Sequence, residues 1–203
     1  MKRHARTAFL AFTFLLLAGC SGTPVQPNTV PPGQAAVTIT FEFQRQSGYA
    51  SNQFAVWIED ADGQYVKTLF ATRFTVKGGY KNRPDSLPVW VEKSGLANMS
   101  NVDAITGATP QSGVLTYIWD LTDLNGSPAP DGTYRFCVEG TLRWKNQVYY
   151  TGQIEIGGAS ASASAEAQYT YEGAADQPAL SENAPENNMI GSVTATYTPG
   201  DPP

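Results

Sequence analysis

The segment from Asp103 to Thr109 holds the residues of this chain whose types and spacing best suit chemistry on a loop. It reads Asp-Ala-Ile-Thr-Gly-Ala-Thr, so one carboxylate and two hydroxyls stand among small side chains. Small residues let a second molecule come close to the backbone. A threonine hydroxyl is a poor nucleophile without an activating base, and no such base is adjacent here. On these residues alone, the segment is either a functional loop or a set of turn formers in which Asp103 caps backbone amides.

The composition excludes several kinds of active site. The only histidine is His4, which lies in the targeting segment described below. Ser-His-Asp and Cys-His nucleophiles, His-ligated zinc and His-ligated haem are therefore excluded from the mature protein. No motif places two carboxylates as an acid/base couple, and no metal-binding signature is present. With 18 acidic and 13 basic residues and a pI near 4.8, the chain offers no basic face for nucleic acid.

The first 34 residues are predicted to export and anchor the protein. Residues 1–19 have a basic start and an apolar run that is short for a bilayer span, as in a signal peptide. The sequence Leu-Ala-Gly-Cys that ends at Cys20 resembles the bacterial lipobox, which implies that Cys20 is lipidated. Ser21 is not acidic, so the same resemblance favours the outer membrane. Residues 20–34 contain four prolines and two glycines and are predicted to be a tether.

Residues 35–203 are predicted to form one domain of short strands. Val37–Gln44 alternates between apolar and polar side chains, as a half-buried strand does. Phe54–Glu59 is apolar on both faces, which indicates a central strand. We expect further strands at Tyr65–Val76, Val114–Leu121, Thr133–Glu139, Gln147–Ile156 and Ile190–Tyr197. Seven to nine such strands predict an all-β, antiparallel Ig-like β-sandwich.

Three regions do not follow the strand pattern. Lys77–Ser112 has no clean alternation and is interpreted as a long functional loop, within which Leu87–Lys93 fits either a helical turn or a short strand. Residues 157–189 are rich in Ala and Ser and then in acidic and polar side chains, so we expect a mobile segment before the last strand. Cys137 is the only mature thiol besides Cys20, and its pattern fits a buried, inert thiol better than a reactive one.

Parts of the chain resemble known families. Val56–Gly63, Asp103–Pro110 and Trp119–Tyr134 are similar to a bacterial periplasmic family catalogued as domain of unknown function 2271. Trp119–Tyr134 also resembles the Ig-like domain of flagellar hook-cap proteins. Both resemblances imply a β-sandwich, and neither by itself implies a reaction.

Asp103–Thr109 further resembles the acceptor motif of bacterial flavin transferases, Asp-x-x-(Ser/Thr)-Gly-Ala-Thr. This resemblance implies that a transferase uses FAD to place FMN on Thr109 through a phosphoester. Asp103, Thr106, Gly107 and Ala108 would then be recognition residues. The implied protein is a redox carrier whose partners are the flavin transferase and membrane redox proteins. Trp90, Tyr117 and Trp119 are candidates for packing on the flavin, although a sandwich core needs such residues too.

Two other readings of the function remain open at this point. The chain could be a non-redox binding or scaffold lipoprotein that uses the 77–112 region to recognise a partner. Less favoured is an enzyme in its own right, which would require a pocket with perturbed ionisable groups.

Overall fold

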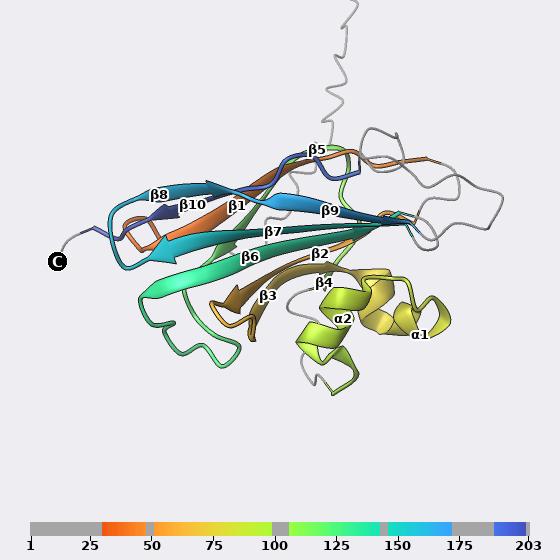
Figure 1. Ribbon diagram of the computed structural model, residues 1–203, viewed down its shortest axis with the longest axis horizontal. Coiled ribbons are helices and arrows are strands. Elements are labelled where there is room, and N and C mark those ends of the chain that lie inside the picture. Colours follow the sequence, from red (N-terminus) through yellow and green to blue (C-terminus); the bar gives the residue numbers. More distant parts are fainter. Residues whose placement is uncertain (1–29, 48–50, 99–105, 143–145, 172–188, 202–203) are drawn as a thin grey trace, which may run out of the picture.

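The computed structural model describes residues 30–47, 51–98, 106–142, 146–171 and 189–201. Within them, ten strands form two sheets that pack face to face (Figure 1). One sheet has the order β5 (Gly113–Trp119), β1 (Ala36–Phe43), β10 (Thr194–Thr198) and β8 (Ala161–Ser164). The other has the order β4 (Thr106–Gly107), β3 (Tyr65–Thr72), β2 (Gln53–Asp60), β6 (Gly132–Thr141), β7 (Asn146–Ile156) and β9 (Glu166–Tyr171). The predicted all-β sandwich is confirmed, with one strand more than the seven to nine expected.

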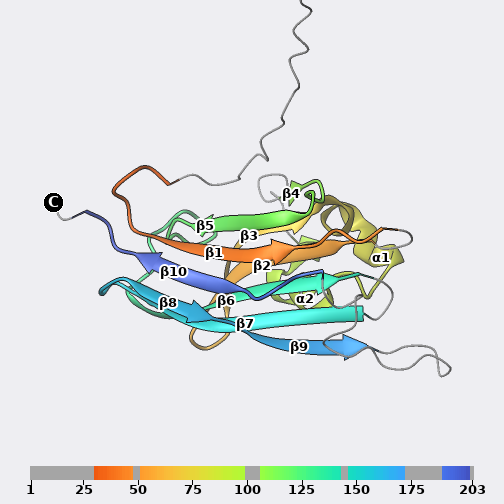
Figure 2. The ribbon, with the colours of Figure 1, turned by 90° about the horizontal axis from the view of Figure 1, so that it is seen from above.

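The strand pairing explains how the chain closes on itself. Every pairing between these strands is antiparallel except that of β3 with β4, which is parallel. The last strand, β10, lies beside the first, β1, with Ala36 opposite Thr198. The prediction that the tail returns to the sheet is therefore confirmed. Figure 2 shows the two sheets from above, with their strands running along the same long direction of the molecule.

An aromatic core fills the space between the sheets. The apolar side chains of β1 point into it, and all four of Val37, Ile39, Phe41 and Phe43 are buried as the alternation predicts. Phe54 of β2 lies at the centre of this core. Its ring centroid is 5.0 Å from that of Phe70 and 5.1 Å from that of Phe43. The contact with Phe43 of β1 joins the two sheets, and the contact with Phe70 of β3 packs the ring along its own sheet.

A second, smaller core lies on the outer face of the six-stranded sheet. There a helical insertion covers the sheet (Figure 1), and it consists of η1 (Thr75–Gly79), α1 (Tyr80–Asn82), α2 (Pro88–Ser94) and η2 (Leu96–Asn98). Trp57 and Cys137 from the sheet pack with Leu87 and Trp90 from the insertion, and all four are fully buried. Strands β2 and β6 are thus buried on both faces, which makes β2 the central strand that its sequence predicted.

The insertion corrects the interpretation of residues 77–112 as one long loop. Leu87–Lys93, for which helix and strand were both open, lies in α2. Pro88 occupies the first turn, where its missing N–H costs nothing, and Gly95 ends the helix at φ 61°. The strand expected at Tyr65–Val76 is also too long, because β3 ends at Thr72 and the chain then turns into η1. Apolar packing and buried hydrogen bonds to the sheet together fix these elements.

The segment expected to be mobile is ordered in its first part. Ala161–Ser164 forms β8 and Glu166–Tyr171 forms β9, two strands that the sequence analysis did not predict. Strand β8 is an edge strand that pairs with β10 through four residues, and its alanines Ala161 and Ala163 pack against the main core while its serines are exposed. Residues 172–188 lie outside the described part of the chain.

The start of the described chain and strand β4 lie at opposite ends of the sandwich. The described chain begins at one end, where the N–H of Asp201 donates to the carbonyl of Gly33 at 2.8 Å. At the opposite end, β1 finishes at Phe43, and Thr72 pairs with Gly107. The start of the domain and the β4 region are therefore separated by the length of β1.

Replacement of Phe54 by Ala tests the central role of this ring. We expect Phe54→Ala to lower the free energy of unfolding by about 3–5 kcal/mol, because it leaves a cavity where both sheets meet. Val114→Ala is the control, since Val114 is 70 % exposed, and it should change stability by about 0.5 kcal/mol or less. Urea unfolding of both variants gives the two values, and similar midpoints would contradict the assignment.

Candidate functional site

The described half of the Asp103–Thr109 segment begins on a sheet edge. Thr106 and Gly107 form β4 and pair in parallel with Ala71 and Thr72 of β3. Asp103 lies outside the described residues, as does Cys20. The segment is thus not a free loop throughout, because its middle is fixed by the six-stranded sheet.

Gly107 is required at its position by close packing. A Cβ added there would overlap Cε2 of Phe70 and lie 3.0 Å from Cζ of the same ring. Phe70 belongs to the main core and is only 4 % exposed, so its ring has little freedom to move. The glycine therefore has a structural reason, the approach of a core ring to the backbone of β4.

The residues after β4 are accessible. Ala108 is exposed and Thr109 is partly exposed, in a stretch without regular structure that leads to β5. None of the described residues forms a hydrogen bond with the Thr109 side chain. The far end of this stretch is held by the Ser112 hydroxyl, which accepts the N–H of Arg45 at 2.9 Å. We call residues 108–112 the acceptor loop, since it presents a hydroxyl between two fixed points.

Buried polar contacts hold the helical insertion that precedes the acceptor loop. The Glu139 carboxylate of β6 accepts the backbone N–H of Trp90 at 2.7 Å and that of Val89 at 3.2 Å, and Gln147 donates to it as well. The indole N–H of Trp90 donates to Thr68 at 2.9 Å. Burial raises the pKa of Glu139 to about 7, against the opposing effect of these hydrogen bonds.

A second polar group connects the start of the insertion to β2. The Gln53 side-chain carbonyl accepts the hydroxyl of Thr72 at 2.6 Å and that of Thr75 at 3.3 Å. Thr75 in turn shares a hydrogen bond of 2.7 Å with Ser86. All four side chains are buried. The turn from β3 into η1, next to β4, is therefore fixed by satisfied polar groups.

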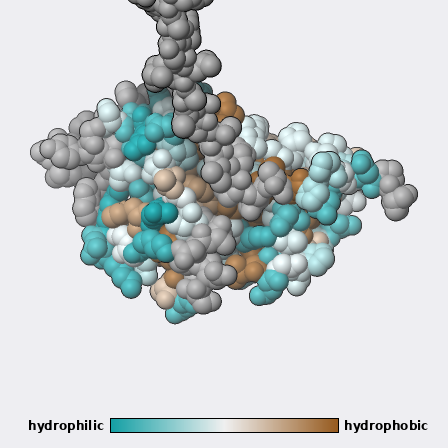
Figure 3. Space-filling view, turned by 180° about the vertical axis from the view of Figure 1, so that it is seen from behind, coloured by the Kyte–Doolittle hydropathy of each residue, from teal (hydrophilic) through white to brown (hydrophobic). Residues whose placement is uncertain are grey.

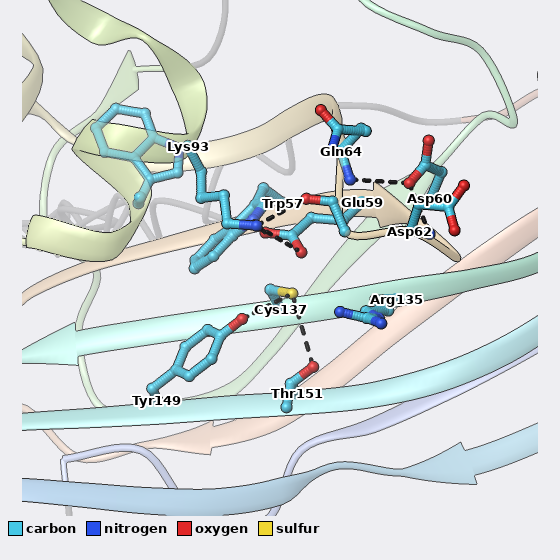
Figure 4. Close-up of polar contacts among 12 residues, drawn as sticks. Trp57, Glu59, Asp60, Asp62, Gln64, Lys93, Arg135, Cys137, Tyr149 and Thr151 are labelled. Carbon is cyan, nitrogen blue, oxygen red and sulfur yellow. Dashed lines mark hydrogen bonds and ion pairs between the residues drawn. The ribbon is translucent and has the colours of Figure 1, made fainter.

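Cys137 lies in a polar cluster on the outer face of the same sheet (Figure 4). Tyr149 donates to its sulfur at 3.4 Å, and burial raises the pKa of the Cys137 thiol to about 12. The thiol therefore stays protonated near neutral pH, so it is a poor nucleophile and fits the predicted inert thiol. Nearby, the buried Glu59 carboxylate accepts the Trp57 indole N–H at 2.9 Å and faces Lys93 at 3.4 Å. This cluster is satisfied internally and joins the insertion to the sheet.

A cavity of about 300 Å³ opens between the sheets at another place. It is lined by Glu42, Gln44, Tyr150, Tyr169, Ile190, Gly191 and Ser192. The Tyr150 hydroxyl donates to the carbonyl of Ile190 at 2.9 Å, so its proton is already used. Nowhere in the described residues do three or more acidic, Cys or His side chains gather as a metal site would need. Glu42 is the one carboxylate among the residues that line the cavity in the described part of the chain.

The aromatic residues expected to pack on a flavin are not available for it. Trp90 and Trp119 are fully buried, and Tyr117 is 4 % exposed. Tyr117 and Trp119 fill the main core, while Trp90 fills the second core. Of the two roles that the sequence left open for these rings, packing in the cores is therefore the one that the structure shows.

Sequence reasoning missed the two buried carboxylates, Glu59 and Glu139. Both stand on strand faces that a single-sided pattern would leave in water. One signal was available in the sequence. Pro88 and Gly95 are typical of the start and end of a helix, and Trp90 between them indicates a helix that packs its apolar side on a sheet. Once that face is covered, its acidic side chains must find buried donors.

Comparison with known proteins identifies one family. The family model described as "Predicted periplasmic protein (DUF2271)" matches residues 34–172, which is more than half of the chain. No curated protein and no solved structure matches the chain. Within the described residues, every helix is too short or too polar to cross a bilayer.

The contact between Gly107 and Phe70 can be tested by a pair of substitutions. Gly107→Ala should lower the free energy of unfolding by about 1–3 kcal/mol, because the added methyl overlaps a core ring. In a Phe70→Leu background the same change should cost clearly less, since the overlapping ring atoms are gone. Urea unfolding of the four proteins measures this coupling, and strictly additive losses would count against the contact.

The buried Glu139 predicts a pH dependence of stability. The pKa of Glu139 is higher in the folded protein than in the unfolded chain, where it is 4.5. The contribution of this group to the free energy of unfolding is therefore fully present below pH 4.5 and is lost as the pH rises through about 7. Wild-type protein should therefore lose stability between pH 5 and pH 8. Glu139→Gln should show a smaller change over this range in urea unfolding. The prediction fails if wild type and variant lose equal stability.

Proposed function

Because the chain belongs to the DUF2271 family of predicted periplasmic proteins, we propose that it is a lipoprotein that carries FMN covalently on Thr109. The observation that carries this proposal is the complete acceptor pattern, Asp103, Thr106, Gly107, Ala108 and Thr109. The geometry agrees with the need of a transferase to reach the hydroxyl. Thr109 is partly exposed on the acceptor loop, and the two residues before it carry little or no side chain.

The attachment step is a phosphoryl transfer catalysed by a separate flavin transferase. The Thr109 oxygen attacks the FMN phosphorus of FAD, and the bond of the diphosphate breaks. AMP leaves, and the hydroxyl proton goes to a base of the transferase. This chain supplies the acceptor and its presentation, since no general base of its own lies beside Thr109 in the sequence.

When bound, FMN would supply reversible electron transfer, and the protein would position it. The sheet edge at β4 fixes one side of the acceptor loop, and the Arg45–Ser112 hydrogen bond fixes the other. We propose that the carrier passes electrons among membrane-associated redox partners. A lipid on Cys20 would keep it at the membrane, in the outer membrane by the identity of Ser21.

The intact mass of the mature domain tests the attachment. The protein is purified after expression with and without a flavin transferase and FAD, and we expect an increment of one FMN only with both. Thr109→Ala should abolish the increment and the yellow colour. Thr198→Ala, which removes an exposed hydroxyl at the opposite end, is the matched control and should be labelled fully.

An unmodified mass for the wild type, with a known acceptor labelled in parallel, would overturn the carrier proposal. Asp103–Thr109 would then be a structural or binding segment, and a non-redox scaffold would become the favoured function. Labelling that persists in Thr109→Ala would place the flavin elsewhere in the chain.

A further inference from the structure

Large exposed apolar side chains are rare on the described surface. On the face seen from behind in Figure 3, brown apolar areas are small and lie between polar ones. Among the described residues, the large hydrophobic side chains left exposed are Phe74 (46 %), Val114 (70 %) and Leu124 (57 %). Single exposed apolar residues need no explanation, but two of these three lie close to the acceptor loop in the fold.

The strand pairing places Phe74 close to the acceptor loop. Thr72 pairs with Gly107, and Phe74 follows only two residues after Thr72. Val114 is the second residue of β5, the strand to which the loop leads. Strands β3 and β5 approach each other at this side of the sandwich. Leu124, by contrast, lies in the turn after β5, at the opposite end of the sandwich.

The Phe74 ring is held in place rather than free. A Cβ on Gly79 would lie 2.6 Å from both Cδ1 and Cε1 of this ring. The ring therefore rests against the bare backbone of η1, while 46 % of the residue stays exposed. An aromatic ring with one edge fixed and the rest open is a preorganised contact for a second flat group.

The charges around Phe74 also differ from those of the whole protein. The chain is acidic, but Arg73, Lys77 and Lys81 are exposed beside Phe74 or on the following turns. A phosphodiester link carries negative charge, which exposed cations at this position would favour.

We propose that Phe74 is the stacking platform for the flavin ring carried on Thr109. The inference rests on the proposed attachment at Thr109. The reach is sufficient: Thr109 is two residues from Gly107, so it lies within about 7 Å of the strand that adjoins β3. The ribityl phosphate chain of FMN extends further from there. Stacking shields one face of the ring from water, whereas the acceptor loop alone would leave it exposed.

Tryptophan substitution tests the platform directly, because an indole in contact with a flavin quenches its emission. The proteins are labelled by the transferase with FAD, and mass confirms equal loading before any comparison. We expect Phe74→Trp to lower flavin fluorescence several-fold against wild type. Leu124→Trp is the matched control, an equally exposed position at the far end, and should leave the emission unchanged.

Removal of the ring gives the opposite signal. Phe74→Ala should increase quenching of the flavin by iodide and lower the anisotropy of its emission, while Leu124→Ala should change neither. Far-UV circular dichroism verifies that both variants stay folded, as expected for side chains that are half exposed. At equal loading, the Phe74 variants and wild type could show equal emission, iodide quenching and anisotropy. That result would overturn the proposal that Phe74 stacks on the flavin, but not the proposed attachment to Thr109. A missing mass increment in every protein would overturn both proposals.

Discussion

The hydrogen bonds from the first turn of α2 to the buried Glu139 carboxylate are the interaction on which the outer layer of this protein depends. Helix termini leave backbone amides unpaired, and a buried carboxylate needs donors. Here the backbone N–H groups of Val89 and Trp90 donate to Glu139, so the helix amides find an acceptor and the carboxylate finds donors. The Trp90 indole then reaches Thr68 of β3, so one residue of the insertion is bound to two strands. The second core forms around these contacts and covers β2 and β6.

The insertion in turn positions the elements around the acceptor loop. It leaves the sheet after Thr72 through a turn held by Gln53, and the chain returns to the sheet at Thr106 beside Ala71. Strand β4 contributes only two residues to the sheet, which is little pairing for an independent strand. Its position is fixed by the fit of Gly107 against Phe70. The same glycine can therefore serve both packing and recognition, and its presence in the motif does not distinguish the two.

How far the sequence predicts this fold depends on which faces of each strand are covered. Strand β1 was predictable because one of its faces packs on the core and the other faces water. Apolar and polar residues therefore alternate regularly over Val37–Phe43. Strand β6 was located correctly, yet Glu139 on its second face was not recognised as buried, because the covering helix lies some fifty residues earlier in the sequence. Strand β8 does alternate, with Ala161 and Ala163 partly buried and the serines exposed, but side chains as small as Ala and Ser make this a weak signal. For the candidate site, the motif residues were visible in the sequence, but the Phe70 contact and the exposed Phe74 ring depend on pairings between distant strands.

Gly33 and Gly107 lie at opposite ends of the sandwich, so under the proposed function the domain would act as a spacer between the anchor and the flavin. Eight residues of β1 span about 26 Å at the usual rise of a strand. An anchor ahead of Val30 would therefore hold the domain at one end, and a group attached to Thr109 would lie at the other end. If a flexible segment precedes the domain, the acceptor loop is the part of the domain that can reach farthest from the point of attachment. A partner would be met first by that end, while the surfaces near Asp201 remain closest to the point of attachment.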